Sequence, residues 1–388
     1  MKCLSSSNAK AASCTVKSDL PIPLNNKQLE HKKIAILGGG LVGRLLAWRL
    51  SSESYDSTKD NGIKSRVEIT VFEKGSLSPI PADSDKAAAF TAAAMISPMS
   101  ELVASELEIY KLGQKSLTLW PLWLSQLGSS QHFHQQGSLV LAHPNDVGEL
   151  HQFKRDLSYK LNQQSNAAAL KVLSDRQQLE ALEPAINSHF QNGIYLPTEA
   201  HIDHNEVLQD LIIQAEKLGV NFSEHCCLEP NDERLKDYDI IFDCRGTGLK
   251  EKGFRGVRGE VIRLESKEVT LKRPIRLMHP RYKLYIVPKP NHQFIIGATE
   301  IESEDKSSIS LRSSMELMSA LYAVNPAFAE ARIISQDTNL RPAYMNNLPR
   351  IEQSLSDLGK PIIRINGLYR HGYLIGPALV EQALEAHL

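Results

Sequence analysis

Cysteine is scarce in this chain, with five residues in 388, and the five form no C-x-x-C pair. Their spacing is typical neither of a disulfide framework nor of a zinc site, so we expect reduced thiols and no bound metal. Long apolar runs are missing as well, since none approaches the ~20 residues that span a bilayer. The first residues are rich in Ser, Asn, Lys and Ala and lack the continuous apolar core of a secretory signal. We therefore expect a polar, disordered tail over residues 1–30, a cytoplasmic location and no stable membrane insertion.

The chain also lacks an excess of charge of either sign. Lys and Arg total 44 against 45 Asp and Glu, which gives a net charge of -1. This balance argues against nucleic-acid binding through a basic field and against a polybasic membrane anchor. The hydrophobic fraction of 42% and the charged fraction of 23% are typical of a soluble globular protein. At roughly 100–200 residues per domain, the length predicts two or three domains.

A glycine-rich turn follows the first apolar run of the chain. Ile34–Leu37 is typical of a buried strand, and Gly38-x-Gly40-x-x-Gly43 comes directly after it. In this fingerprint the first glycine makes a tight turn, the second lets the backbone approach a pyrophosphate, and the third lets helix and strand pack closely. A helix is expected through Leu50, and a second strand over Val67–Phe72. This order predicts a dinucleotide-binding βαβ unit, with the pyrophosphate at the helix N-terminus.

Glu73 ends the second strand, where an acidic residue accepts hydrogen bonds from ribose hydroxyl groups. Its distance from the glycines exceeds the usual ~20 residues, and the polar insert Ser51–Ser65, which we expect to end the helix, accounts for the excess. The alternative is a solvated strand end. The fingerprint by itself does not distinguish NAD from FAD.

Helix and strand patterns alternate over the rest of the chain. Helices are expected at 105–127, 205–218 and 311–323, from about Pro377 to His387, and over most of 146–183 apart from a Gln/Asn/Ser/Ala-rich patch at 162–169. Strands are expected at 137–142, 239–244 and 361–365, and a strand meander at 257–264, 284–287 and 294–298. Strands of a doubly wound sheet thus occur at the start, middle and end of the chain. This order predicts one dinucleotide domain built from separated pieces with a second sheet-containing domain inserted.

Four further stretches resemble the D-amino-acid oxidase superfamily of flavoproteins, most closely its glycine oxidase branch serving thiamine biosynthesis. They are Ala88–Glu101 (AAFTAAAMISPMSE), Tyr285–Glu300 (YIVPKPNHQFIIGATE), Asn339–Tyr344 (NLRPAY) and Asn366–Pro377 (NGLYRHGYLIGP). Features are shared with sarcosine oxidases and with the oxidase half of a bifunctional tRNA-uridine modification enzyme. The resemblance implies an α/β fold with a discontinuous Rossmann-type FAD-binding domain (31–110, 195–250 and 335–388). An inserted α+β substrate domain on an antiparallel sheet would then cover 111–194 and 251–334.

The resemblance implies FAD as the cofactor. Its contacts are expected from the glycine turn, the end of the second strand, a run of small residues beside the flavin ring, the turn after residue 244 and the last loop: Gly38, Gly40, Leu41, Val42, Gly43, Glu73, Lys74, Ala93, Ala94, Met95, Gly246, Gly248, Arg341, Gly372, Tyr373, Leu374 and Ile375. The family has Gly where Ala94 stands, so the local backbone is expected to differ slightly. The alternatives are an Ala-rich helix start at 92–95 and a simple turn at 246–248. The loop Gly372–Pro377, before the final helix, would favour negative charge on the reduced flavin.

The resemblance also implies a substrate side. Arg341 stands where the family's arginine pairs with the substrate carboxylate, a role that suits the planar guanidinium fork. Arg370, Tyr285, Met95 and Glu300 are expected around it. If Glu300 faces the substrate, it would disfavour acidic side chains and favour an amine-bearing end. The alternatives are surface arginines, a core-strand tyrosine and a solvated strand end at Glu300.

Thirteen histidines are scattered along the chain, among them His132, His134, His201, His204 and His371. Such scatter is typical of surface positions. The expected reaction needs no side-chain acid or base, because a neutral amine passes its α-hydride directly to flavin N5. We therefore assign no catalytic histidine.

The resulting hypothesis is FAD-dependent oxidation of a small amino acid, with glycine as first candidate. The expected products are an imine that hydrolyses to an oxo acid and ammonia, and hydrogen peroxide from dioxygen. Two alternatives remain: a dehydrogenase of the same fold with a quinone-type acceptor, and a flavoprotein accessory factor that modifies a partner protein. Expected partners are a small amino acid or amine and dioxygen, with no nucleic acid, and a homo-oligomer is left open.

Overall fold

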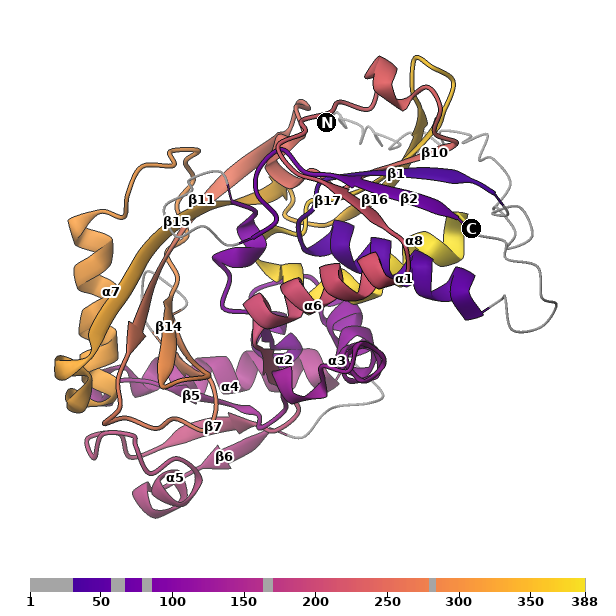
Figure 1. The fold of residues 1–388 in the computed structure, drawn as a ribbon. Coiled ribbons are helices and arrows are strands. Elements are labelled where there is room, and N and C mark those ends of the chain that lie inside the picture. The colour runs from indigo at the N-terminus through magenta and orange to yellow at the C-terminus, as the bar shows by residue number, and fades with distance from the viewer. Residues whose placement is uncertain (1–30, 57–66, 79–85, 163–169, 279–283, 388) are drawn as a thin grey trace, which may run out of the picture.

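Two large β-sheets dominate the computed structural model, which describes residues 31–56, 67–78, 86–162, 170–278 and 284–387. The expectations for the tail at 1–30 and for most of the patch at 162–169 lie outside these residues. A six-stranded and an eight-stranded sheet stand next to each other, with helices packed on both (Figure 1). The α/β fold class that the sequence predicts is confirmed.

The six-stranded sheet has the order β16-β17-β10-β1-β2-β9. Five of its strands run parallel and β16, at one edge, is antiparallel to β17. The strands are β1 (Lys33–Leu37), β2 (Glu68–Phe72), β9 (Asn221–Ser223), β10 (Ile240–Asp243), β16 (Arg350–Leu355) and β17 (Pro361–Asn366). Because they come from the start, the middle and the end of the chain, this sheet is discontinuous in sequence, as expected.

One face of this sheet packs against four helices through a single apolar core (Figure 1). They are α1 (Leu41–Asp56), α3 (Leu107–Leu127), α6 (His204–Lys217) and α8 (Gly372–His387). The other face packs against a smaller cluster that includes Leu228 and Leu235. Because both faces are covered, β1 and β10 are buried almost throughout, which is why they appear as continuous apolar runs in the sequence.

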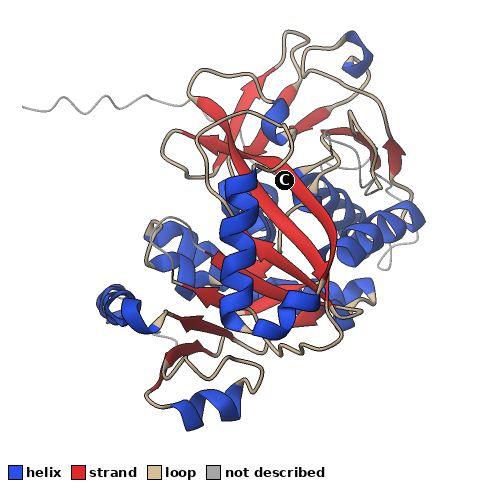
Figure 2. Ribbon diagram, turned by 90° about the vertical axis from the view of Figure 1, so that its left-hand side faces the viewer, coloured by secondary structure: helices blue, strands red, loops and turns tan. Residues whose placement is uncertain are grey.

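The eight-stranded sheet has the order β15-β11-β14-β13-β12-β5-β7-β6 and is antiparallel except for the β12–β5 pair. Its strands are β5 (Ser138–Leu141), β6 (Lys171–Leu173), β7 (Gly193–Leu196), β11 (Phe254–Glu265), β12 (Ile275–Leu277), β13 (Leu284–Lys289), β14 (Gln293–Gly297) and β15 (Arg332–Tyr344). Helix α7 (Leu311–Val324) lies across it, as Figure 2 shows. The predicted meander corresponds to β11, β13 and β14.

Short elements connect the two sheets. Strands β3 (Met95–Ile96), β8 (Ala200–Ile202) and β4 (Phe133–His134) form a three-stranded sheet. The remaining helices are α2 (Pro98–Leu102), α4 (Val147–Asn162) and α5 (Arg176–Leu182), of which α2 and α4 join a third apolar cluster with β5 and β7.

Three sequence expectations about helix limits are wrong. Helix α1 continues to Asp56 instead of ending near Leu50, since polar residues alone do not stop a helix and no Gly or Pro stands between Ser51 and Asp56. The hydroxyls of Ser51 and Ser52 donate to carbonyls three residues back. Strand β6 interrupts the helical region expected at 146–183. Helix α8 begins at Gly372, five residues before Pro377, so the expected loop is its first turn.

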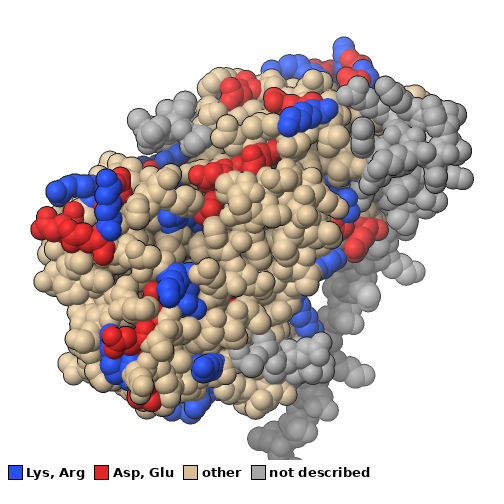
Figure 3. All heavy atoms as spheres, turned by 60° about the horizontal axis from the view of Figure 1, so that its bottom comes forward, with Lys and Arg blue, Asp and Glu red and all other residues tan. Residues whose placement is uncertain are grey.

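The domain limits drawn from the sequence stay a prediction, and three of them fall inside continuous elements. The limit at 194/195 lies within β7. The limit at 110/111 lies within α3, whose buried residues share the core of the six-stranded sheet. The limit at 334/335 lies within β15, which pairs along its length with β11 of the larger sheet. On the face shown in Figure 3, basic and acidic side chains are interspersed.

Candidate active site

A long pocket lies between the carboxyl ends of the parallel strands and the inner face of the larger sheet. Seventeen of the predicted site residues line it: Gly38, Gly40, Leu41, Val42, Glu73, Lys74, Ala93, Ala94, Met95, Gly246, Tyr285, Glu300, Arg341, Arg370, Gly372, Tyr373 and Leu374. Gly43, Gly248 and Ile375 are not part of the lining. The residues that the resemblance assigns to cofactor and substrate thus converge on one continuous cavity.

The glycine turn at one end of the pocket has the backbone that the fingerprint requires. Gly38 adopts φ = +102°, and a Cβ there would lie 2.5 Å from the carbonyl oxygen of Cys244. A Cβ at Gly43 would overlap the carbonyl oxygen of Gly38, so this glycine serves helix–strand packing and does not reach the pocket. A Cβ at Gly40 would have the Cβ of Ala87, at 3.7 Å, as its nearest heavy atom. The open side of Gly40 is therefore the pocket itself.

Glu73 lies beneath this turn and is only 8% exposed. Its carboxylate accepts hydrogen bonds from the backbone N–H groups of Gly39 at 2.7 Å and Gly75 at 3.0 Å. Each carboxylate oxygen has a further lone pair, so these bonds leave acceptor capacity toward the pocket. The residue is therefore more than a solvated strand end, and a ribose contact stays a prediction.

Arg44, which sequence reasoning missed, supports the same turn from behind. Its buried guanidinium donates to the carbonyls of Gly39 at 2.6 Å, Leu77 at 2.7 Å and Leu208 at 2.8 Å. Burial lowers its pKa to about 10, against the opposing effect of nearby acidic groups, so it stays charged at neutral pH. Arg44 directly follows the last glycine of the fingerprint, which itself places no requirement on that position, so the sequence gives no signal for this role.

The N-terminus of α8 forms another wall of the pocket through Gly372, Tyr373 and Leu374. The unpaired N–H groups and the dipole of this 16-residue helix favour negative charge in front of it. The Tyr373 hydroxyl donates to the carbonyl of Ala89 at 3.1 Å, which joins the helix to the small-residue segment. The structure thus has a helix N-terminus where a loop was expected, and its effect on the charge of a reduced flavin stays a prediction.

The residues present fit an FAD molecule. Two helix N-termini, those of α1 and α8, open on the same pocket, and helix N-termini bind anions such as pyrophosphate. The open side of Gly40 provides backbone without a side chain where a phosphate would pass. Glu73 provides a buried acceptor next to it.

An apolar floor lies under the middle of the pocket. Ala93, with Met95 and Tyr285 packed beside it, belongs to a cluster completed by Val261, Val287, Ile295 and Ala298. Burial raises the pKa of the Tyr285 phenol, with Arg341 opposing the shift, so the hydroxyl is a neutral donor. Ala94 has φ = +56°, a left-handed conformation that glycine adopts without cost. This conformation is strained at Ala94, and the expected difference from the family's local backbone stays a prediction.

Arg341 extends from β15 across β11 into the pocket. Its Nη2 donates to the carbonyl of Thr299 at 2.9 Å and its Nη1 to the carbonyl of Arg258 at 3.2 Å. A Cβ at Gly259 would collide with the guanidinium, so this glycine makes room for it. Within the described part of the chain, no carboxylate lies within 4.0 Å of its nitrogens. The positive charge of Arg341 thus faces the pocket without a paired carboxylate.

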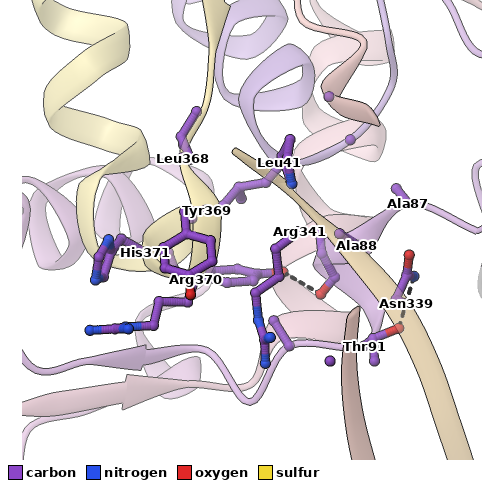
Figure 4. Close-up of a pocket in the computed structure, with 18 of the residues that line it drawn as sticks. Leu41, Ala87, Ala88, Thr91, Asn339, Arg341, Leu368, Tyr369, Arg370 and His371 are labelled. Carbon is purple, nitrogen blue, oxygen red and sulfur yellow. Dashed lines mark hydrogen bonds between the residues drawn. The ribbon is translucent and has the colours of Figure 1, made fainter. Parts of the chain in front are cut away.

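Arg370 is held differently. Its Nε donates to Glu101 at 2.9 Å and its Nη1 to Glu300 at 3.1 Å. Figure 4 shows Arg370 and His371 on one side of the Tyr369 ring and Arg341 on the other. Both carboxylates outweigh the effect of burial and raise the pKa of Arg370.

Glu101 is the centre of a buried charge network that sequence reasoning missed. Besides Arg370 it accepts from Arg276 at 2.9 Å, and Nε2 of His371 lies 3.1 Å from it. Although burial alone would raise it, the two guanidinium groups hold the pKa of Glu101 well below its usual range. Glu101 ends one of the stretches that carry the resemblance, but its partners are far away in sequence.

Glu300 stands at the rim of the pocket with an exposed side chain. It pairs with Arg370, and burial together with the nearby Glu300 carboxylate raises the pKa of Tyr369. The carboxylate is therefore neither a plain solvated strand end nor an unpaired charge.

The expectation of surface histidines is wrong for His201, His204 and His371, which are buried. Apart from His371, the histidines that the structure describes lie outside the pocket lining. His134 bonds to Asp203 at 2.8 Å, and His132 lies 3.5 Å from the same carboxylate. Burial and the nearby Lys289 lower the pKa values of His201 and His204 well below the usual range. Among the described residues, no group of three His, Cys, Asp or Glu side chains is arranged to hold a metal ion.

Comparisons with known proteins agree with this geometry. A family model described as FAD dependent oxidoreductase matches residues 33–383. The chain is 34% identical over 352 residues to a Rhizobium etli protein named as a thiamine biosynthesis oxidoreductase, ThiO, covering 90% of this chain and 94% of that one. It is 22% identical to a glycine oxidase of Geobacillus kaustophilus, over 89% of each chain.

Among solved structures, a glycine oxidase from Bacillus cereus superposes with a TM-score of 0.72 at 18% identity, over 92% of this chain and 96% of that one. An iminodiacetate oxidase from Chelativorans superposes with a TM-score of 0.71 at 17% identity, over 91% and 94%. In the part of the chain that the structure describes, no helix is long and apolar enough to cross a bilayer. The match over nearly the whole chain, and the relative above 30% identity, show that this chain belongs to the family of FAD-dependent oxidoreductases.

Proposed function

We propose that this protein oxidises the amine of a small amino acid with a single carboxylate, glycine being the first candidate. One observation carries the proposal: Arg341 faces the pocket with its guanidinium fixed by two backbone carbonyls and without a carboxylate partner among the described residues. A guanidinium group that is held in place and whose charge is not paired with a carboxylate is suited to bind one carboxylate. The names of two relatives, glycine oxidases of two bacilli, support the same class of substrate.

The chain's own residues bind and orient the substrate. Arg341 pairs with the substrate carboxylate, and the hydroxyl of Tyr285, on β13, donates a hydrogen bond to the same carboxylate. The apolar floor around Ala93 and Met95 excludes water from the α-carbon side. The bound FAD supplies the two-electron acceptor, so that the α-carbon loses a hydride and the nitrogen a proton.

The amine must reach the pocket in its neutral form. Among the described residues, His371 is the histidine that lines the pocket, and its Nε2 is bonded to Glu101 and so is not available to take a proton from the amine. We accordingly assign no side-chain base, and the amine proton leaves to water. Hydrolysis of the resulting imine gives an oxo acid and ammonia.

We infer that dioxygen takes the electrons in a second half-reaction and gives hydrogen peroxide. A dehydrogenase with a quinone-type acceptor is the second candidate, which structural similarity to an L-proline dehydrogenase supports at the level of the fold. The name of one relative, a thiamine biosynthesis oxidoreductase, supports a role in which the imine is passed on before it hydrolyses.

The test is a substrate panel on purified holoprotein under anaerobic conditions. Glycine, sarcosine and D-alanine are each added, and loss of the oxidised flavin absorbance is followed by stopped flow. At least one of them is expected to bleach the flavin, and admission of air is expected to restore the absorbance with formation of peroxide. Bleaching that only a quinone or dye reverses would favour the dehydrogenase, and no bleaching by any amino acid would contradict the proposal.

A further inference from the structure

The two arginines at the substrate end of the pocket differ in how their charge is balanced. Arg341 donates to two backbone carbonyls, which leaves its full charge toward the pocket. Arg370 is paired with two carboxylates, those of Glu101 and Glu300. The first is available to a substrate carboxylate and the second is already neutralised.

The two partners of Arg370 have different surroundings. Glu101 is 8% exposed and also pairs with Arg276, so it is a fixed part of the buried network. The Glu300 side chain is 41% exposed at the rim, where it contacts Arg370 and Tyr369. Glu300 is therefore the partner that a ligand entering the pocket would meet first, and its replacement leaves the pairs that Glu101 makes with Arg370 and Arg276 in place.

We propose that Glu300 is a specificity-determining residue that restricts the pocket to amines with one carboxylate, by occupying Arg370 and repelling a second carboxylate. The inference rests on the proposed function, because it takes Arg341 as the site of the first carboxylate. Because Arg341 and Arg370 line the same pocket, the second carboxylate of a dicarboxylate amine bound at Arg341 could pair with Arg370 only by displacing Glu300 or lying beside it. Selection by an unfavourable contact with the wrong ligand is a general route to specificity.

The pairing of Glu300 with Arg370 also changes the expectation for substrates that carry a cationic side chain. A lone carboxylate at the rim would attract a second amine, but the charge of Glu300 is balanced by Arg370 at 3.1 Å. The balanced pair therefore selects against an extra negative charge without selecting for a positive one. Loss of Glu300 would leave Arg370 sharing Glu101 with Arg276, and so with capacity for another carboxylate.

The test compares holoprotein carrying Glu300→Gln with wild type and with Glu302→Gln. Glu302 lies two residues further, pairs with Arg255 at 2.9 Å and is not part of the pocket lining, so it is a matched control for loss of one rim charge. Acetate and malonate serve as mono- and dicarboxylate probes, and their Kd values are measured by perturbation of the flavin spectrum. Glycine and iminodiacetate serve as the matching substrates.

In Glu300→Gln the ratio of the malonate Kd to the acetate Kd is expected to fall by about 10-fold or more, since a charge-assisted pair becomes available to the second carboxylate. The ratio of kcat/KM for iminodiacetate to that for glycine is expected to rise in parallel. Glu302→Gln is expected to leave both ratios within about 2-fold of wild type, because exposed pairs contribute little. Glu300→Ala, which also removes the contact with Tyr369, is expected to repeat the Gln result.

An unchanged ratio in both Glu300 variants, with flavin content and Tm retained, would overturn the inference. Equal changes of the two ratios in Glu302→Gln would overturn it too, because they would show that the loss of any nearby negative charge has the same effect. Wild-type protein that binds no acetate and oxidises no amino acid would instead refute the proposed function. The two failures are therefore distinguishable.

Discussion

The indole nitrogen of Trp120 donates a hydrogen bond of 2.8 Å to the carbonyl oxygen of Tyr373. In a regular helix that carbonyl would accept from the residue four positions later, which is Pro377 and has no N–H. Trp120, from α3, thus supplies the donor that proline removes from the second turn of α8. The helix can begin at Gly372 and present its N-terminus to the pocket because another helix completes its bonding.

Replacement of Trp120 by Phe is expected to lower the free energy of unfolding by about 2–4 kcal/mol. The buried Tyr373 carbonyl would lose its partner, and the smaller ring would leave a cavity. Chemical denaturation measures the loss, and flavin content reports on the α8 N-terminus. Trp123→Phe, which removes the same volume from a buried tryptophan of the same helix, is the control. Equal losses in the two variants would show that volume alone matters.

Gly40→Val is expected to abolish flavin binding while the protein still folds. A Cβ at this position meets no protein atom closer than 3.7 Å, so the side chain would extend into the space of the pyrophosphate. Flavin absorbance after purification and after reconstitution measures the effect, and circular dichroism confirms the fold. Gly148→Val in α4, where a Cβ has nothing within 4 Å, is expected to keep the colour. A yellow Gly40→Val protein would refute the assigned path of the phosphates.

Ala94→Gly is expected to preserve or raise stability, by up to about 1 kcal/mol. The left-handed backbone at φ = +56° is costly for alanine, and its relief exceeds the entropy that glycine adds to the unfolded chain. Ala93→Gly, at the neighbouring pocket position without a positive φ, is expected to lose about 0.5–1 kcal/mol. Thermal denaturation of the two holoproteins compares them, and a loss at Ala94 as large as at Ala93 would contradict the strain.

The sequence predicted the parallel sheet well because its strands are short apolar runs that end in diagnostic turns. Ile34–Leu37 and the glycines after it are local signals, and their structural roles follow from the backbone alone. Strands β3 and β8 escaped prediction because each has two or three residues and pairs with a distant segment, as Met95 does with His201. Such pairs leave no periodicity to detect.

The residues of the candidate site fall into the same two groups. Arg341 was predicted from a local motif, and its side chain donates to the carbonyl of Arg258 on the neighbouring strand β11. Glu101 and Arg276 are 175 positions apart, and only the folded chain brings their side chains to 2.9 Å. The start of α8 was missed for a comparable reason, since Pro377 locally signals a helix start and the compensating donor is on another helix.

Lys289 is expected to make the stability of the protein rise with pH above neutrality. Burial lowers its pKa to about 7 from the ordinary 10.5, against the opposing charge of Asp203 and Glu206 and with the help of Arg263. Between about pH 7 and 10.5 the unfolded chain therefore holds a proton that the native protein has lost, and ∂ΔG/∂pH is positive. The slope is expected to approach about 1.4 kcal/mol per pH unit in the middle of that range.

The measurement is the difference in unfolding free energy between wild type and Lys289→Met from about pH 6.5 to 10.5, which spans the two pKa values. Other titrating groups cancel in this difference, so the advantage of the variant is expected to shrink as the pH rises. Lys252→Met, at an exposed position, is the control and should show no such trend. A pH-independent difference would mean that Lys289 keeps its proton in the native protein.

Arg341→Ala tests the substrate carboxylate contact, and with it the proposed class of substrate. A shielded charge-assisted pair contributes on the order of 2–4 kcal/mol, which corresponds to a loss of roughly 30- to 1000-fold in kcat/KM for glycine. Arg341→Lys is expected to recover only part of the loss, because an ammonium keeps the charge without the planar fork. Arg332→Ala, at the exposed start of the same strand, is the control.

Flavin content separates a binding role from a structural one. Arg341 donates to carbonyls of β11 and of the segment after β14, and its removal should leave the glycine turn and the α8 N-terminus intact. The Ala variant is therefore expected to retain FAD and to oxidise amines without a carboxylate as slowly or as fast as wild type. If it loses flavin, or loses activity toward both kinds of amine equally, then Arg341 supports the fold of the pocket. The proposal of a substrate with a single carboxylate must then be abandoned.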